Sequence, residues 1–346
     1  MYSGAAFDWV KNCTVEHSED IREHRHQLHG GEILFQERLE NHPERVFDEN
    51  WQRAEIFAVP ALLVFAWWRK WSPTPSCNGL SFTEQLNATG EALLASPYFR
   101  NKGGRDHLIV ADSYASNYMP WRCTISVPYV HKPNAHTNER HTLNIGDKVP
   151  RDKGVFFMGL MDAREAYLTR RQVAKKILPM AELNMTFIST VRDGDKYNAH
   201  FPEECDVDAC LDAPRCANCS LLNAANYNLY EHRLERSQFS LMIKGDSPSS
   251  QRLYDSLAYG TIPVIISNRL WHTGMPFPGK VPWQDLVYSL EENFTIDEFK
   301  QVMATPMDTI IRKRELIRMY FKDVSWTVPG SRVVDNILEE TLRYCL

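Results

Sequence analysis

The segment Lys244–Ser267, KGDSPSSQRLYDSLAYGTIPVIIS, contains the pattern that decides the fold. Pro248 and the serines beside it end a preceding strand and supply helix N-caps. Apolar residues then recur at helical spacing from Leu253, and Gly260 gives the helix a stop. Ile262–Ile266 shows too little polar alternation for a half-exposed strand, so we expect it to be buried on both faces. The segment therefore predicts a loop, a helix, a tight turn and a core strand.

The start of this helix is suited to bind an anion. Backbone N–H groups of the first helical turn point at whatever lies above it. Ser247, Ser249 and Ser250 add hydroxyl groups, and the guanidinium of Arg252 can bind a diphosphate with two parallel hydrogen bonds. Asp255 lies one turn from Arg252, so an ordinary ion pair between these two side chains is the structural alternative.

The same segment resembles the signature of the exostosin family of glycosyltransferases, in which a Ser-Pro-rich turn leads into an Arg-Leu helix and a Gly-x-Ile-Pro-Val-Ile strand. Four further stretches resemble the family in the same order, and together they extend from Ala54 to Glu292. They are AEIFAVPAL (Ala54–Leu62), GGRDHLIVAD (Gly103–Asp112), KGVFFMGLMDAR (Lys153–Arg164) and MPFPGKVPWQDLVYSLEE (Met275–Glu292). Five stretches in order are more specific than any one motif.

The resemblance implies a fold and an activity. It implies a GT-B fold, in which two Rossmann-like domains face each other across a cleft, and transfer of a sugar from a nucleoside diphosphate sugar, expected to be a UDP-sugar, to a glycan with inversion. Asp255, at the acidic position of the family helix, would bind the ribose hydroxyls. No metal cofactor is expected, because cationic side chains and helix N-termini would neutralise the diphosphate. Arg164 and Arg192, just beyond predicted strand ends, are further candidates for that role.

The order of predicted elements independently favours an α/β fold with two doubly wound domains. Strands alternate with helices twice along the chain, which is typical of parallel sheets, and the first set of strands includes Ile56–Val59, Leu108–Ala111 and Cys123–Val130. We predict an N-terminal extension or incomplete first-domain segment (1–50), an acceptor-side Rossmann-like domain (51–150), a nucleotide-sugar domain (151–325) and a C-terminal helix (326–346). In such sheets ligands bind outside the carboxyl ends of the strands.

Three residues are candidates for the base that deprotonates the acceptor. Asp106, His107 and Asp112 surround a predicted strand, Leu108–Ala111. Asp112 follows the carboxyl end of that strand, where it would face the cleft, whereas the family motif favours Asp106 and His107. The base therefore stays open between them, and His107 is equally well explained as a core histidine that supports the Gly103–Gly104 turn.

Composition excludes several other classes of protein. Of the 346 residues, 24% are charged and 43% are hydrophobic, and the formal net charge is −5. The acidic balance, with Lys and Arg spread along the chain, argues against a nucleic-acid partner. The longest apolar run, Ile56–Trp68, is interrupted by Pro60 and is shorter than the roughly 20 residues that span a bilayer. The first residues show no basic start or apolar core typical of a signal peptide.

Four cysteines, Cys205, Cys210, Cys216 and Cys219, fall within one short stretch, CDVDACLDAPRCANC. They could form two disulfides or a four-cysteine zinc site. The spacing is cramped for zinc, and the resemblance to a secretory-pathway family favours disulfides. We therefore predict a protein of the Golgi lumen and no bound metal.

Two functions follow as alternatives. The first is a glycosyltransferase that uses a nucleotide-sugar donor and an oligo- or polysaccharide acceptor. The second is an inactive subunit of the same fold, which binds a glycan or a partner glycosyltransferase without turnover. A zinc-stabilised interaction module is a third reading and depends on the cysteine cluster.

Overall fold

The structure is a computed structural model, and it describes residues 30–45, 48–59, 61, 81–110, 125–131, 151, 153–160, 165–180, 185–190, 226–245, 248–270 and 275–346. The chain divides into two compact units: residues 1–133 together with 322–346, and residues 134–321. Each unit is described by itself. No helix in the described part of the chain is both long and apolar enough to cross a bilayer.

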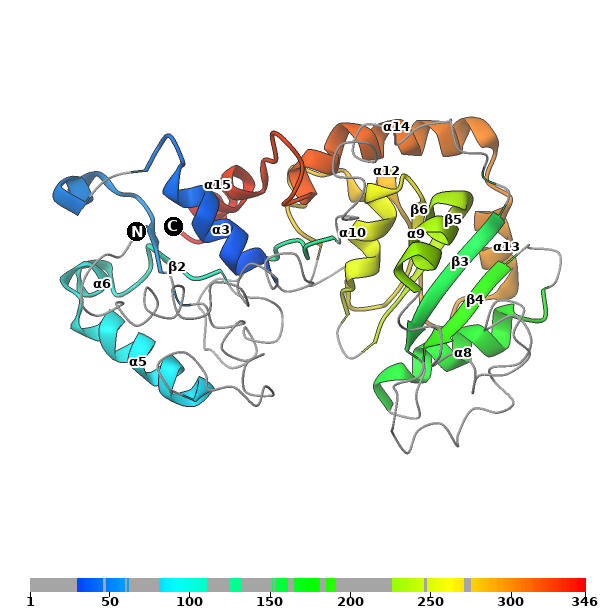
Figure 1. The fold of residues 1–346 in the computed structure, drawn as a ribbon, viewed down its shortest axis with the longest axis horizontal. Helices are drawn as coiled ribbons and strands as arrows, with labels where there is room; N and C mark the ends of the chain where they lie inside the picture. Colours follow the sequence, from blue (N-terminus) through cyan, green and yellow to red (C-terminus); the bar gives the residue numbers. More distant parts are fainter. Residues whose placement is uncertain are drawn as a thin grey trace. The chain divides into compact units, whose positions relative to one another are not determined.

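The unit formed by residues 134–321 is built on a five-stranded parallel sheet. Its strands follow the order β4-β3-β5-β6-β7, and every neighbouring pair is parallel (Figure 1). Their bounds are Lys153–Leu160 (β3), Met185–Thr190 (β4), Ser237–Ile243 (β5), Ile262–Ile266 (β6) and Tyr288–Leu290 (β7). All five residues of β6 are buried, which confirms the core strand expected from the sequence.

Helices alternate with the strands as the sequence predicts, and two more helices follow β7. They are α8 (Leu168–Ile177), α9 (Asn226–Arg236), α10 (Gln251–Ala258), α12 (Trp283–Leu286), α13 (Ile296–Met303) and α14 (Met307–Val324), the last of which contains the division at residue 321. Tyr230 of α9 donates a hydrogen bond to Asp255 of α10, so these two helices share one face of the sheet. Right-handed crossovers place α8, which links β3 to β4, on the opposite face.

The signature segment folds as expected. Ser250 is the N-cap of α10, and its hydroxyl oxygen accepts a hydrogen bond from the backbone N–H of Arg252. Gly260 adopts a left-handed conformation (φ 63°), which an L side chain rarely tolerates, and this turn joins α10 to β6.

The other unit contains a short parallel pair of strands, β1 (Phe57–Ala58) and β2 (His107–Leu108), within its described residues. Its helices are α3 (Gly31–Glu40), η2 (Asp48–Arg53), α5 (Phe82–Ala95), α6 (Pro97–Lys102) and α15 (Val333–Tyr344). The indole of the fully buried Trp326 packs against Gly31 and donates a hydrogen bond to the carbonyl of Pro128.

One strand prediction for this unit is wrong. The sequence predicts a strand over Cys123–Val130, but residues 125–131 form no ladder. Pro128 lacks a backbone N–H group, and its carbonyl accepts the Trp326 indole instead of a strand partner. The apolar, β-prone residues of this stretch therefore form a buried extended segment that does not pair with another strand.

Candidate functional site

The strand order of the larger sheet locates the position where a ligand is expected. From β3 the chain crosses to β4 on one side, whereas from β5 it crosses to β6 on the other, so the winding reverses between β3 and β5. In doubly wound sheets with this order, ligands bind at the carboxyl ends of the two strands that flank the reversal. The carboxyl ends of β3 and β5 are therefore the candidate site.

The two strands separate at this end. Their register pairs run from Lys153–Ser237 to Phe156–Ser240 and stop there. Both strands continue further, β3 to Leu160 and β5 to Ile243. The strand carbonyls beyond this point need other hydrogen-bond donors, because a buried carbonyl without a partner is costly.

Arg252 is one of these donors. Its Nε and Nη2 atoms donate hydrogen bonds to the carbonyl oxygen of Met158 on β3, at 3.1 and 2.7 Å. Its Nη1 atom lies 3.4 Å from Oγ of Ser250, the N-cap of α10. The guanidinium carbon is 4.7 Å from the centre of the Phe157 ring. Arg252 thus joins the end of β3 to the start of α10.

The charge of Arg252 lies near one carboxylate of the described residues, that of Asp255, without a direct ion pair to it. The side chain is buried, and burial lowers the pKa of its guanidinium, while the neighbouring Tyr230 and Asp255 oppose that shift. No acidic side chain of the described residues forms an ion pair with it. Because a buried cation is costly unless it is paired, the lack of a direct ion pair among the described residues favours a bound anion at this position.

Gly159 makes the position of Arg252 possible. A Cβ atom on Gly159 would lie 2.6 Å from Nη2 of Arg252 and 3.0 Å from the Phe157 ring. A Cβ atom at the first distance would force the guanidinium to shift, and the second distance is tighter than an ordinary van der Waals contact. The glycine that follows the buried apolar run of β3 is therefore needed for packing and not for a turn.

Asp255 does not form the ion pair with Arg252 that was considered as the structural alternative. Its Oδ2 atom accepts a hydrogen bond from the hydroxyl of Tyr230 at 3.0 Å. Tyr230 is half-buried as a whole residue, and desolvation of its phenol together with the negative charge of Asp255 raises the pKa of that group well above the ordinary value. The carboxylate of Asp255 is buried between α9 and α10, and its assignment to a ribose hydroxyl remains a prediction.

The serines of the signature lie at the start of α10. Ser249 and Ser250 are both partly exposed, in agreement with a surface that could contact a ligand. Four other sequence candidates, Ser247, Arg164, Arg192 and Asp112, lie outside the described residues, as do the four clustered cysteines. Their predicted roles stay predictions.

His107 is the first residue of β2 in the smaller sheet, and Asp106 directly precedes that strand. Nδ1 of His107 is 2.9 Å from Oδ1 of Asp106, and Lys102 lies 3.3 Å from the other carboxylate oxygen. The imidazole stacks on Phe57 and meets the edge of Phe99, with ring centres 5.1 and 5.0 Å apart. Burial lowers the pKa of His107, although the hydrogen bond and the charge of Asp106 oppose this. The imidazole is thus neutral near pH 7, as a base requires, but it is packed as a core histidine would be.

The turn before His107 depends on the same cluster. Gly104 has φ 73°, and a Cβ atom there would lie 2.3 Å from the Phe99 ring. The carbonyl of Gly104 accepts the backbone N–H of His107 at 3.1 Å. These contacts support the structural explanation of His107 without testing the catalytic one.

A polar network at the carboxyl edge was not predicted. Lys244, which follows β5, pairs with Glu292, which follows β7, at 2.6 Å. Glu292 also accepts hydrogen bonds from the hydroxyl of Thr169 and the backbone N–H of Asn268, the latter located after β6. Burial would raise the pKa of Glu292, but these hydrogen bonds lower it overall. The sequence did contain a pattern that could have indicated this network, because a polar residue lies one or two positions after each of the strands β5, β6 and β7.

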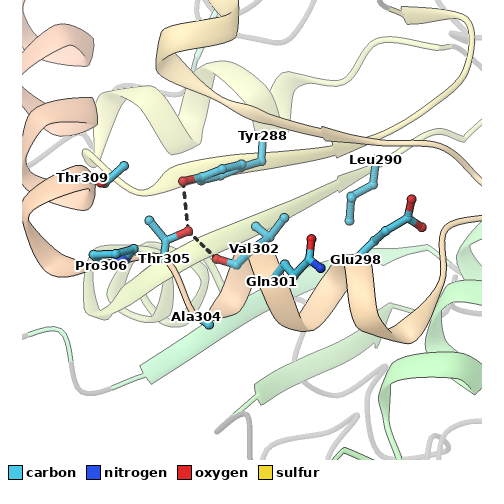
Figure 2. A pocket seen from close by; sticks show the side chains of 9 residues that line it. All are labelled: Tyr288, Leu290, Glu298, Gln301, Val302, Ala304, Thr305, Pro306 and Thr309. Carbon is cyan, nitrogen blue, oxygen red and sulfur yellow. Dashed lines mark hydrogen bonds between the residues drawn. The ribbon is translucent and has the colours of Figure 1, made fainter.

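A shallow pocket of about 370 Å³ lies at the far edge of the sheet, between β7 and α13 (Figure 2). Figure 2 shows the hydroxyl of Thr305 bridging the hydroxyl of Tyr288 and the carbonyl of Val302. Because β6 and β5 separate this pocket from the reversal point, it is not part of the candidate site.

Two aromatic residues near this edge are packing residues. Trp283 is buried and donates its indole N–H to the carbonyl of Pro276 at 2.7 Å. Phe277 is fully buried as well, with φ 53°. Neither ring offers a free face for a base or a sugar.

Comparison with known proteins finds one matching family model and several curated relatives. A sequence model described as the Exostosin GT47 domain matches residues 7–303. A probable glucuronoxylan glucuronosyltransferase of Arabidopsis thaliana is 26% identical over 191 residues, which cover 54% of this chain and 35% of the relative. A probable glucuronosyltransferase of Oryza sativa subsp. japonica is 32% identical over 88 residues, covering 25% of this chain and 20% of the relative.

A third relative, a probable beta-1,4-xylosyltransferase of Arabidopsis thaliana, is 30% identical over 90 residues, covering 25% of this chain and 21% of the relative. The chain therefore spans between about a fifth and about a third of the length of these curated relatives.

Proposed function

The chain belongs to the exostosin GT47 family, and from this premise we propose that it is a glycosyltransferase that moves a sugar from a UDP-sugar to a glycan. The observation that carries the proposal is the position of Arg252. It is a buried cation that forms no direct ion pair with the described residues, and it lies at the start of α10, where the winding of the sheet reverses.

In the proposed reaction, Arg252 and the start of α10 stabilise the departing diphosphate. Cleavage of the sugar–phosphate bond leaves negative charge on the diphosphate, and that charge can be stabilised by N–H groups that are already oriented. The N-terminus of α10 and the guanidinium of Arg252 supply such groups, and the hydroxyls of Ser249 and Ser250 add donors. In this proposal the reaction needs no metal ion, and Asp255 holds the ribose.

The acceptor would be activated from the other unit. We place the two units in a GT-B arrangement, with the acceptor on residues 51–150 and inversion at the anomeric carbon. Asp112 or the Asp106–His107 pair is the proposed base. The neutral state of His107, favoured by burial, is compatible with that role.

The names of the relatives guide the choice of donors to test. Because those relatives are named as glucuronosyl- and xylosyltransferases, UDP-glucuronate and UDP-xylose are the donors to test first. We place the enzyme in the Golgi lumen, acting on polysaccharide, with a partner glycosyltransferase subunit as a possible assembly. Cys345, which is disulfide-bonded, is compatible with an oxidising compartment.

Binding of UDP in buffer that contains EDTA tests the donor half of the proposal. We expect calorimetry to give a saturable one-site isotherm for the whole chain, and the affinity to fall by at least tenfold in Arg252→Gln. Arg312→Gln, on the exposed side of α14, is the matched control and should bind as the wild type does. Wild-type affinity in Arg252→Gln would remove Arg252 from the site.

A further inference from the structure

Arg170, on α8, is placed at the end of β5 as Arg252 is placed at the end of β3: each is a buried arginine that donates to a main-chain carbonyl. It was not singled out by its sequence, because it lies within a helix that contains several basic residues. Its side chain is buried, and its guanidinium carbon lies 4.7 Å from the centre of the Tyr167 ring and 6.0 Å from that of Phe157. Arg252 contacts the same Phe157 ring, so both cations lie close to the carboxyl half of β3.

The hydrogen bonds of Arg170 are made to the end of β5. Its Nε atom donates to the carbonyls of Lys244 and Ile243, at 3.2 and 3.4 Å. Arg252 makes the equivalent contact at the end of β3, on the Met158 carbonyl. Each of the two strands that flank the candidate site is thus held at its carboxyl end by a buried arginine from a helix.

A glycine makes each contact possible. A Cβ atom on Gly245 would lie 2.6 Å from Nη2 of Arg170 and 3.0 Å from the Tyr167 ring, as a Cβ atom on Gly159 would meet Arg252. The φ angle of Gly245 is not in the left-handed region that only glycine adopts readily. The requirement at residue 245 is therefore space for the guanidinium.

The remaining contacts at this edge restrain the same segment. Lys244 is held by the ion pair with Glu292, and its backbone N–H donates to the carbonyl of Ile266 on β6. Glu292 in turn accepts the hydroxyl of Thr169, the residue before Arg170. The chain that leaves β5 is fixed from α8, from β6 and from the residues after β7.

We infer that Arg170 is a positioning residue for the donor nucleotide: by holding the carboxyl end of β5 it sets the geometry of the diphosphate site, with Gly245 as its steric counterpart. The inference rests on the proposed function. It assigns Arg170 no contact with substrate: its single Nε–H group is shared between two main-chain carbonyls, and its role is to hold them.

The test measures UDP affinity by calorimetry for the whole chain and for four variants: Arg170→Gln, Gly245→Ala, the double variant, and Gln172→Ala as an exposed control on the same helix. Near-ultraviolet circular dichroism and the unfolding temperature establish that each variant is folded. We expect Arg170→Gln and Gly245→Ala each to weaken UDP binding by tenfold or more. The double variant should be no weaker than either single variant, because both act on one contact.

The outcomes separate the two claims. If the wild type binds UDP and both single variants bind it equally well, while their unfolding temperatures fall, Arg170 is only a stabilising residue and the inference is overturned. Multiplied effects in the double variant would also overturn it, because the two residues would then act independently. If the wild type binds no UDP, the proposed function fails. Should Arg170→Gln not fold, Gly245→Ala alone decides.

Discussion

Replacement of Gly159 by alanine adds one methyl group at the point where the account requires empty space. Gly159 lies near the carboxyl end of β3, outside the left-handed region of φ, so its backbone conformation accepts alanine. The new Cβ atom would lie 2.6 Å from Nη2 of Arg252 and 3.0 Å from the Phe157 ring. Either the arginine or the strand must move.

The size of the effect follows from what must move. Extra methyl groups in a well-packed interior cost about 1–3 kcal/mol. A shift of Arg252 also weakens two hydrogen bonds to the Met158 carbonyl, and charged donors contribute about 1.5–3 kcal/mol each. Since part of this is recovered by relaxation, we expect the free energy of unfolding to fall by about 2–3 kcal/mol. Displacement of the guanidinium from the diphosphate site should weaken UDP binding by at least tenfold, which is about 1.4 kcal/mol.

Urea unfolding and UDP calorimetry measure the two effects on the same samples. The matched control is Gly90→Ala, because Gly90 lies inside α5 and its Cβ would meet no atom within 4 Å. Alanine is the better helix former by about 0.5–1 kcal/mol, so this control should be slightly more stable and should bind UDP normally.

A third variant links the effect to Arg252. In the Arg252→Ala background there is no guanidinium for the new methyl group to meet, so Gly159→Ala should cost much less there than in the wild type. If Gly159→Ala keeps both wild-type stability and wild-type UDP affinity, the proposed packing of Arg252 is refuted. An equal cost in both backgrounds would show that the methyl group acts elsewhere.

Three further predictions concern other buried groups. Tyr230→Phe leaves the buried Asp255 carboxylate without its phenol donor and should lower the free energy of unfolding by about 1–3 kcal/mol, measured by urea titration. Burial lowers the pKa of His131 from 6.5 to about 4. The unfolded chain therefore binds the proton first, and stability should fall as the pH drops from about 6.5 to 4, by on the order of 3 kcal/mol. His131→Asn should lack this component when wild type and variant are compared across that range, and identical pH profiles would contradict it. Arg252→Gln should lose sugar transfer to a glycan acceptor by at least a hundredfold while Arg312→Gln retains it, and equal rates would exclude a role for Arg252.

Local patterns predicted most of the larger unit. The N-cap at Ser250, the stop at Gly260 and the buried strand Ile262–Ile266 all depend on residues that are close in sequence, and all three are confirmed. The reversal of winding between β3 and β5 could not be predicted in the same way, because strand order depends on contacts between distant segments.

The candidate site was predicted in part. Arg252 was identified from its place in the helix, but its partner, the Met158 carbonyl, is 94 residues away. Arg170 was missed, since its basic neighbours in α8 make it look like part of a solvated helix face. Its burial becomes visible only when α8 packs beside the end of β5. The strand expected at Cys123–Val130 failed for a related reason: Trp326, distant in sequence, takes the Pro128 carbonyl.

The most direct test of the central claim is UDP release by the purified chain, made in a secretory host, with a panel of UDP-sugars that includes UDP-glucuronate and UDP-xylose and with oligosaccharide acceptors. The account predicts release with one donor, dependent on acceptor, unaffected by EDTA and lost in Arg252→Gln. Absence of release from every donor, together with absence of UDP binding by the folded protein, would contradict it.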